Sequence, residues 1–279
     1  MSNNQYFPSW INKAEELYKN GTPYYKIGNE LGVSRKTVSY YLRELGYKSN
    51  PLYARQVDPK KLTKYSYNES YFSIIDTEEK AYWLGFLYAD GDISRFKHSI
   101  TLALKESDYD HLVKFKQSLD LPNKITQKIK YDKKTEKTYY GYTIGFTCQS
   151  IHQDLINLGC TPRKSLTLKF PEEDKVPKTL QRHFIRGYFD GDGCILKTHL
   201  TVNLLGTYEF LDKCMECFGL HKNKISLCSN HNQTYSITYS GIFAEHILHY
   251  LYDDATIYLD RKYKLYKKYL PSSIEAVKD

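Results

Sequence analysis

One short pattern occurs twice in the sequence, and it limits what the chain can fold into more than any other feature. The first copy covers residues 78–92 and the second covers residues 182–193. Each copy predicts a helix that ends at an Asp-Gly step, and the aspartates of those steps are Asp90 and Asp192. These aspartates are 102 residues apart (192 − 90 = 102), which predicts two halves of similar length, each beginning with one such helix.

Small residues mark one face of each predicted helix. Gly85 and Ala89 are four positions apart in the first copy, and Gly187 and Gly191 match them in the second. Residues four positions apart lie on the same side of a helix, and small side chains there let two backbones approach closely. We therefore expect the two helices to pack on each other along these faces, with their terminal aspartates side by side.

The two terminal aspartates would form an unfavourable arrangement on their own. Adjacent carboxylates repel each other, and the C-terminal ends of two helix dipoles add further negative charge. A divalent cation resolves this conflict, because carboxylate oxygens suit Mg²⁺ (or Mn²⁺) and such an ion can activate water for phosphoryl displacement. Asp90 and Asp192 are therefore candidate metal ligands and catalytic residues. For one copy alone, a core helix that ends in an Asp-Gly turn would explain the pattern equally well.

The two segments resemble the paired motifs of the LAGLIDADG homing endonucleases. Residues 83–91 and 185–193 occupy the motif positions, and the match holds at the central glycine and at the aspartate-glycine pair. The resemblance implies a site-specific, metal-dependent DNA endonuclease that cuts both strands across the minor groove and leaves short overhangs. It also implies hydrolysis by metal-activated water, with the backbone carbonyls of Ala89 and Gly191 helping Asp90 and Asp192 to hold the metals.

An Arg-Lys pair follows each predicted half at a similar distance from its motif aspartate. The lysines of these pairs are Lys164 and Lys262. In the family that the chain resembles, a lysine at about this point of each half lies near the scissile phosphate, so both are candidate catalytic residues. A cation there can stabilise developing phosphoryl charge or polarise the attacking water. Ordinary surface lysines remain an alternative, because lysines are abundant near the second position.

Helices and strands are expected to alternate in the same order after each motif helix. The predicted fold class is α+β, with two pseudo-symmetric αββαββα halves that form a LAGLIDADG endonuclease domain at 71–165 and 180–279, joined by 166–179. Two halves in one chain predict a monomer with internal pseudo-twofold symmetry. The expected strands are 92–96, 99–105, 124–131, 138–147, 194–197, 200–205, 224–228 and 234–239. The other expected helices of this domain are 109–119, 150–158, 208–218 and 242–252.

Residues 1–46 predict a small all-α module that precedes this domain. Apolar periodicity and glycine stops mark helices at 9–20, 24–31 and 34–45. The module resembles a helix-turn-helix, whose last helix enters the DNA major groove, and a helical protein-interaction module is the alternative. Its predicted core is Ile27, Leu31, Val33, Val38, Leu42 and Leu45. Its predicted DNA-binding residues are Arg35, Lys36, Thr37, Ser39, Tyr40 and Arg43.

A basic linker is predicted at 47–70, where periodicity is absent and prolines occur at Pro51 and Pro59. Between residues 48 and 68, five basic residues oppose a single acid, Asp58. Such a segment could lie along phosphates or in the minor groove, or it could be a solvated tether, and both interpretations stay open.

Alternation along the expected strands separates an apolar face from a polar one. Ile100, Leu102, Ile125 and Ile129 are expected on the core face. A polar face of Lys, Thr, Ser and Asn offers hydrogen-bonding groups for base edges and cations for phosphates, although a solvated face looks the same in sequence. The predicted DNA-binding residues on these strands are Thr101, Lys105, Thr126, Lys128, Lys130, Thr201, Asn203, Ser226, Ser236 and Thr238.

The composition agrees with a double-stranded DNA partner rather than a membrane. The net charge is +8 and 28 residues are tyrosines, which favours polyanions, although an AT-rich genome would also enrich Lys and Tyr. No apolar run approaches the roughly 18 residues that span a membrane, and no signal peptide is evident. Six scattered cysteines, including Cys214 and Cys217, suggest core thiols in a reducing compartment. We expect a cytoplasmic location, in a bacterial, phage or organellar setting.

Two other functions remain open from the sequence. One is a non-cleaving transcriptional regulator that joins a helix-turn-helix to a degenerate endonuclease domain, although both motif aspartates are retained. The other is an RNA-binding maturase, an intron-splicing cofactor of a kind known in the family. The helix-turn-helix favours duplex DNA over RNA.

Overall fold

In the computed structural model, the chain forms two compact units, Met1–Lys64 and Tyr65–Asp279. The structure describes residues 7–47, 67–133, 135–162, 164, 167–196, 200–220, 225–228 and 234–269. Most of the predicted linker at 47–70 lies outside the described residues.

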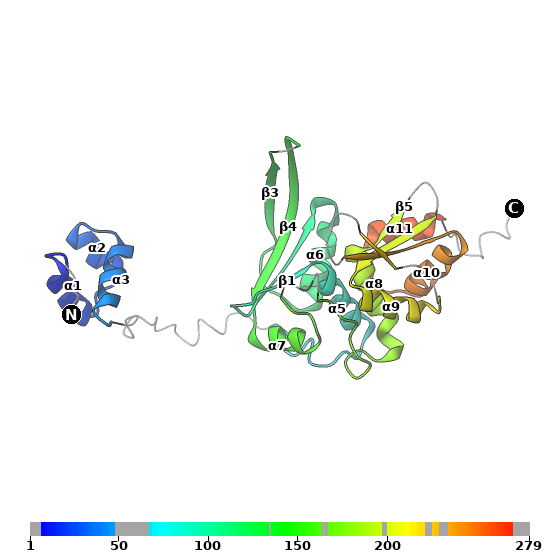
Figure 1. Ribbon diagram of the computed structural model, residues 1–279, viewed down its shortest axis with the longest axis horizontal. Helices are drawn as coiled ribbons and strands as arrows, with labels where there is room; N and C mark the ends of the chain where they lie inside the picture. Colours follow the sequence, from blue (N-terminus) through cyan, green and yellow to red (C-terminus); the bar gives the residue numbers. More distant parts are fainter. Residues whose placement is uncertain are drawn as a thin grey trace. The chain divides into compact units, whose positions relative to one another are not determined.

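The described residues of the first unit form three helices, α1 (Ile11–Lys19), α2 (Tyr24–Leu31) and α3 (Arg35–Glu44) (Figure 1). Gly32 ends α2 in the left-handed conformation, with a φ of 69°, which glycine adopts at little cost. Ser34 begins α3, because its Oγ accepts a hydrogen bond from the Thr37 amide at 3.1 Å. The tight turn between α2 and α3 predicted from the sequence is therefore present.

A small apolar core holds these three helices together. Its buried members are Ala14, Tyr18, Ile27, Val38 and Leu42. Leu31 and Val33 pack at its margin, as half-buried residues. The prediction for Leu45 was wrong: this side chain is 36% exposed, because it follows the last turn of α3 and no longer faces the other helices.

The second unit contains two halves with the same order of elements (Figure 1). The first half contains α5 (Glu78–Asp90), β1 (Gly91–Ile93), β2 (Ser99–Lys105), η2 (Glu106–Asp108), α6 (Tyr109–Ser118), β3 (Thr126–Asp132), β4 (Lys137–Thr147) and α7 (Gln149–Asn157). The second half contains α8 (Lys178–Asp192), β5 (Cys194–Leu196), β6 (Thr201–Gly206), α9 (Tyr208–Phe218), β7 (Ser226–Leu227), β8 (Tyr235–Ser240), α10 (Ile242–Tyr252) and α11 (Asp260–Tyr269).

Each half builds one four-stranded antiparallel sheet. The strand orders are β1-β2-β4-β3 and β5-β6-β8-β7, so the two sheets have the same topology. This arrangement confirms the predicted α+β class and the repeated order of helices and strands. Helix α11 was not predicted, and strands β1 and β7 are shorter than expected.

Helices α5 and α8 pack against each other between the two sheets (Figure 1). Every residue from Ala81 to Tyr88 is buried, because one side of α5 meets α8 and the other sides meet the first sheet and its helices. A helix that is apolar all round is expected in such a position. The two motif helices therefore form the centre of the core.

The β3–β4 hairpin extends beyond this core (Figure 1). We predicted Ile129 on the core face, but the structure leaves it 63% exposed. Tyr131 and Tyr140 on the same face are also exposed, because no helix covers this end of the sheet. Alternation along the strand is present, but neither face of the hairpin reaches the core at this end.

Candidate active site

Both motif helices end where the sequence predicts. Thr77 begins α5, because its hydroxyl accepts a hydrogen bond from the Lys80 amide at 3.3 Å, and acids occupy the first turn. Asp90 is the last residue of α5 and Asp192 is the last residue of α8, each followed by a glycine at the start of a strand or its approach. The chain leaves each helix directly into the first strand of its sheet.

Two glycines let the helices cross at close range, and their contacts are reciprocal. A methyl group on Gly85 would overlap the carbonyl oxygen of Phe184 and lie 2.9 Å from the amide nitrogen of Tyr188. A methyl group on Gly187 would overlap the carbonyl oxygen of Tyr82 and lie 2.9 Å from the amide nitrogen of Phe86. Both contacts are with backbone, which cannot move aside. The close approach predicted from the small residues is present.

The crossing brings the two acidic helix ends together. A methyl group on Gly191 would lie 3.2 Å from Oδ2 of Asp90 and 3.5 Å from its Cγ, so the Asp90 carboxylate rests against the last turn of α8. Asp192 is the next residue along that turn. Both aspartates reach solvent at the end of the helix pair.

The electrostatics of this site disfavour two negative charges. Desolvation by the surrounding protein, together with the charge of Asp192, raises the pKa of Asp90 to about 6, although Lys262, Lys164 and Arg261 oppose the shift. Desolvation also raises the pKa of Asp192, and the same two lysines oppose it. A bound cation would relieve this repulsion, which is why the donor set fits a divalent metal.

The two predicted lysines occupy equivalent positions in the two halves. Lys164 Nζ donates a hydrogen bond to the carbonyl of Gly91, and Lys262 Nζ donates to that of Gly193 at 2.5 Å. Lys262 also binds the carbonyls of Phe189 and, at 2.9 Å, Asp190. Both side chains are buried, and burial lowers the pKa of Lys262 to about 8. Each lysine thus places a cation beneath the C-terminal end of a motif helix.

A buried polar network, not predicted from the sequence, supports the second motif helix. Asp190 is fully buried and accepts hydrogen bonds from Tyr82 Oη at 2.7 Å, Tyr252 Oη at 2.6 Å and the Leu259 amide at 2.7 Å. Arg186 is also fully buried and donates through Nε to the carbonyl of Ile257 at 2.9 Å. These bonds fix the segment that leads to Lys262. The available signal was two charged residues inside an otherwise apolar helix pattern.

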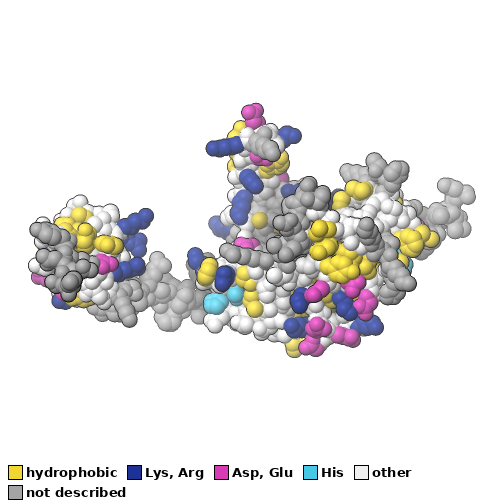
Figure 2. All heavy atoms as spheres, in the orientation of Figure 1, with side chains coloured by type: hydrophobic (Ala, Val, Ile, Leu, Met, Phe, Trp, Pro, Cys, Tyr) yellow, Lys and Arg dark blue, Asp and Glu magenta, His cyan; other side chains and the backbone are white. Residues whose placement is uncertain are grey.

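The predicted DNA-binding residues of the first sheet share one face. The register pairs Lys105 with Gly141 and Gly141 with Lys128, and it pairs Lys130 with Tyr139, so these side chains lie on one side of the sheet. Thr101 and Thr126 lie on the same side by the same alternation. The three lysines are exposed, and Lys and Arg side chains follow the hairpin in Figure 2.

The second sheet has a mixed face, on which Leu196 and Leu205 are exposed beside polar residues, and its described strands carry no charged residue there. Asn203 pairs with Thr238, and Ser236 pairs with Ser226, so all four lie on one side. Thr201 departs from the expectation, because it is only 8% exposed and its hydroxyl bonds Ser240 Oγ at 2.8 Å. Thr201 lies on the same side of the sheet as Asn203 but is largely covered in the free chain, and its contact with DNA stays a prediction.

The third helix of the first unit presents the predicted basic residues to solvent. Arg35, Lys36, Tyr40 and Arg43 are exposed, and cationic side chains gather on one side of this unit in Figure 2. Thr37 and Ser39 are half-buried. Ser34 Oγ and Thr37 Oγ1 lie 2.7 Å apart, so Thr37 also takes part in the helix cap.

Other kinds of site are not evident in the described part of the chain. Within it, three or more His, Cys, Asp or Glu side chains do not cluster as a metal-binding group. The described cysteines are free thiols, and Cys214 and Cys217 lie on one helix. No helix among the described residues is long and apolar enough to cross a membrane.

The chain is similar in structure to homing endonucleases of known structure. No family model and no curated protein sequence matches it. The homing endonuclease I-WcaI bound to its DNA recognition sequence is 13% identical, with a TM-score of 0.50 over 74% of this chain and 96% of that chain. LAGLIDADG meganuclease I-AabMI bound to uncleaved DNA is 15% identical, with a TM-score of 0.43 over 71% and 91%. I-DmoI in complex with DNA and Mn is 17% identical, with a TM-score of 0.41 over 66% and 97%. The likeness to I-WcaI confirms the fold predicted from the two motifs.

Proposed function

We propose that this chain, which has the LAGLIDADG homing endonuclease fold, is a site-specific endonuclease that hydrolyses both strands of a long duplex DNA target with a divalent metal. The observation that carries the proposal is that Asp90 and Asp192 lie at the ends of two helices, α5 and α8, which cross at close range with a glycine of each helix against the backbone of the other. The DNA-bound state of I-WcaI supports the choice of DNA as the partner.

The donor set of the site suits Mg²⁺ or Mn²⁺. The two carboxylates, with the backbone carbonyls of Ala89 and Gly191, would supply only oxygen ligands, which hard divalent cations prefer. When bound, the metal supplies a water of lowered pKa and a charge that stabilises the displaced phosphoryl oxygens. The raised pKa of Asp90, caused by desolvation and by Asp192, supports a cation between the carboxylates.

The chain's own cations would prepare the site for a phosphate. Lys164 and Lys262 each hold the backbone at the end of a motif helix, where the Gly91 and Gly193 carbonyls lead into the first strands. Their positive charges also favour the ionised form of both aspartates, because they oppose the rise in pKa that desolvation causes. In this role the lysines position the acids and raise the local potential for the scissile phosphate.

The remaining surfaces would select and hold the duplex. The polar faces of the two sheets would each read one half of the target, with Lys128 and Lys130 on phosphates and Asn203 and Thr238 on base edges. A monomer suffices, because one chain supplies both halves of the pseudo-twofold site. Helix α3 of the first unit would enter a major groove and extend the recognised sequence.

A cleavage assay tests the proposal. The substrate is the genomic DNA that flanks the gene, joined without the insert that encodes this chain, and it is incubated with Mg²⁺ or with chelator. Asp90→Asn and Asp192→Asn should each abolish double-strand cleavage while the gel-shift affinity for the same DNA is retained. Asp212→Asn, which removes an exposed carboxylate from α9, is the matched control and should cut like the unmodified chain.

Two outcomes would contradict the proposal. If either aspartate variant cuts both strands at the unmodified rate, the paired carboxylates are not the catalytic centre. If the unmodified chain binds the duplex with Mg²⁺ and cuts neither strand, the chain is a non-cleaving regulator with this fold.

A further inference from the structure

Two leucines interrupt the polar residues on one face of the second sheet. Leu205 lies on β6, two residues after Asn203, and Leu196 on β5 pairs with Thr201. Both leucines are therefore on the side of the sheet that carries the predicted base-reading residues. Leu205 is 38% exposed and Leu196 is 47% exposed. The core lies on the other face of this sheet, where Leu204 is buried.

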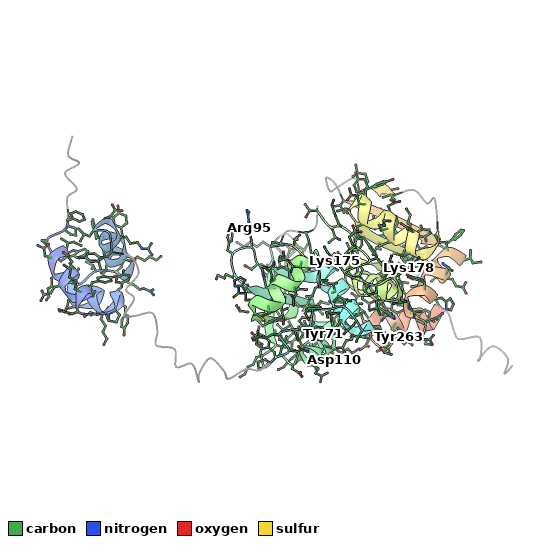
Figure 3. The ribbon with its side chains drawn as sticks, turned by 90° about the horizontal axis from the view of Figure 1, so that it is seen from below. Tyr71, Arg95, Asp110, Lys175, Lys178 and Tyr263 are labelled. Atoms are coloured by element: carbon green, nitrogen blue, oxygen red, sulfur yellow. The ribbon has the colours of Figure 1, made fainter. Side chains whose placement is uncertain are left out.

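The position of Leu205 is fixed from inside the molecule. Tyr188 on the motif helix α8 donates a hydrogen bond to the Leu205 carbonyl at 2.9 Å, and β8 pairs with β6 at this point through Ser236. Helices α9 and α10 contact β6 and β8 from the core side, and Figure 3 labels Lys178 and Tyr263 on the neighbouring helices α8 and α11. Leu205 is therefore held at the surface by packed helices and strands.

The matching positions of the first sheet carry smaller side chains. Ser94 and Leu196 each lie four residues after the motif aspartate of their half. Ala103 and Leu205 also match, since each lies two residues after the strand partner of the second residue beyond that aspartate. On the base-reading face, one half of the chain thus has two leucines where the other half has a serine and an alanine.

An exposed leucine on a base-reading surface has one chemical match in unmodified DNA. Leucine has no hydrogen-bonding group in its side chain, so it cannot read the donors and acceptors of the base edges. Only the major groove is wide enough to admit neighbouring strands, which lie about 4.8 Å apart. The apolar group that a base presents in that groove is the C5 methyl group of thymine.

We propose that Leu205 and Leu196 are specificity-determining residues, each of which packs against the methyl group of a thymine in the half of the target bound by the second sheet. The inference rests on the proposed endonuclease function and names a base chemistry for one half of its target. Ala103 and Ser94 offer less apolar surface at the matching positions. The two halves of the target therefore depend on thymine methyl groups to different degrees.

Deoxyuridine tests this inference, because it lacks only the methyl group of thymidine and keeps every hydrogen-bonding group of the base. Each thymine of the uninterrupted genomic duplex is replaced in turn, and affinity is measured by competition gel shift in chelator, which keeps the duplex uncut. For the unmodified chain, deoxyuridine at the thymine that contacts each leucine should weaken binding by about three- to fivefold, as expected for one buried methyl group. Both sensitive thymines should lie in the same half of the target.

Two variants assign the sensitive thymines to their leucines. Leu205→Ala, which copies Ala103 of the first sheet, should bind the thymine and deoxyuridine duplexes equally well at one sensitive position and should leave the other position sensitive. Leu196→Ser, which copies Ser94, should do the reverse. Retained thermal midpoints would show that both variants are folded.

Leu227→Ala is the matched control. Leu227 is 60% exposed on the same sheet, but it pairs with Tyr235 and so lies on the opposite side from Leu205. Its loss removes the same amount of side chain, and its deoxyuridine profile should equal that of the unmodified chain.

Two results would overturn the inference while the endonuclease function stands. One is an unmodified chain that tolerates deoxyuridine at every thymine of its target. The other is a sensitive thymine that stays equally sensitive in both Leu205→Ala and Leu196→Ser. If the unmodified chain neither binds nor cuts the duplex, the proposed function fails, and this inference fails with it.

Discussion

The crossing of α5 and α8 makes Gly85→Ala the most decisive single substitution in this chain. In a solvent-exposed helix, alanine in place of glycine stabilises by about 1 kcal/mol, because alanine has the higher helix propensity. Here the added methyl group would overlap the Phe184 carbonyl oxygen and lie 2.8 Å from its carbon. Packing therefore predicts the opposite sign from helix propensity.

The expected loss follows from what surrounds the glycine. Overpacking a rigid core costs about 1–3 kcal/mol, and the upper end applies because the contacts are with backbone on a helix that is itself buried. For a unit of this size, a loss of about 3 kcal/mol lowers the thermal midpoint by about 6–12 °C. The helices must also separate, which moves Asp90 away from Gly191, so cleavage should fall even below the new midpoint.

Thermal unfolding by circular dichroism measures the first effect and plasmid cleavage measures the second. Gly206→Ala is the matched control, because a methyl group there would meet only side chains, with Phe210 at 3.2 Å and Leu211 at 3.4 Å, which can shift slightly. We expect its midpoint to change by no more than about 2 °C. If Gly85→Ala is as stable as the unmodified chain, the close helix crossing and the paired carboxylates that depend on it are refuted.

Three further results are expected. Burial lowers the pKa of His111 to about 3, so the neutral ring stabilises the fold above its ordinary pKa and this stability is lost as the pH falls toward 3. Urea unfolding should show that the free energy of unfolding of the unmodified chain, relative to that of His111→Gln, falls by about 3 kcal/mol between pH 7 and pH 4. A difference that stays constant over this pH range would contradict the prediction. Replacing Lys128 and Lys130 by Gln should reduce the slope of log affinity against log salt by about 2, whereas Thr238→Val should leave that slope unchanged. Deleting residues 1–46 should weaken DNA binding and lower the same slope while cleavage at saturating protein is retained, and loss of cleavage there would contradict the modular arrangement.

The centre of the fold could be predicted from the sequence because local signals and packing agree there. Each motif helix has a glycine four positions before another small residue, which indicates that the two helices pack closely. Each also ends in an Asp-Gly step, and these steps are 102 residues apart, which indicates that the two helices end side by side. The polar sheet faces also follow from alternation, since strands place successive side chains on opposite sides.

The errors arose where one residue depends on distant parts of the chain. Ile129 alternates correctly, but alternation does not reveal that the hairpin leaves the core. Helix α11 has tyrosines three positions apart, at Tyr263, Tyr266 and Tyr269, but lysines occupy most of the remaining positions, and no helix was predicted there. The pairing of Asp108 with Arg261 joins residues 153 positions apart, and the capping rule predicts a different partner for Asp108.

The projecting β3–β4 hairpin has a consequence for handling the protein. Strand β3 is the last strand of its sheet, so one row of its amide and carbonyl groups has no neighbouring strand within that sheet. An open edge of this kind invites a strand from another molecule, and repeated lysines are a common natural defence against such stacking. Lys128 and Lys130 therefore also keep the protein soluble. Variants that remove both charges should aggregate at lower protein concentration. Replacement of both lysines by glutamate, which keeps a charge at each position, should retain the protection.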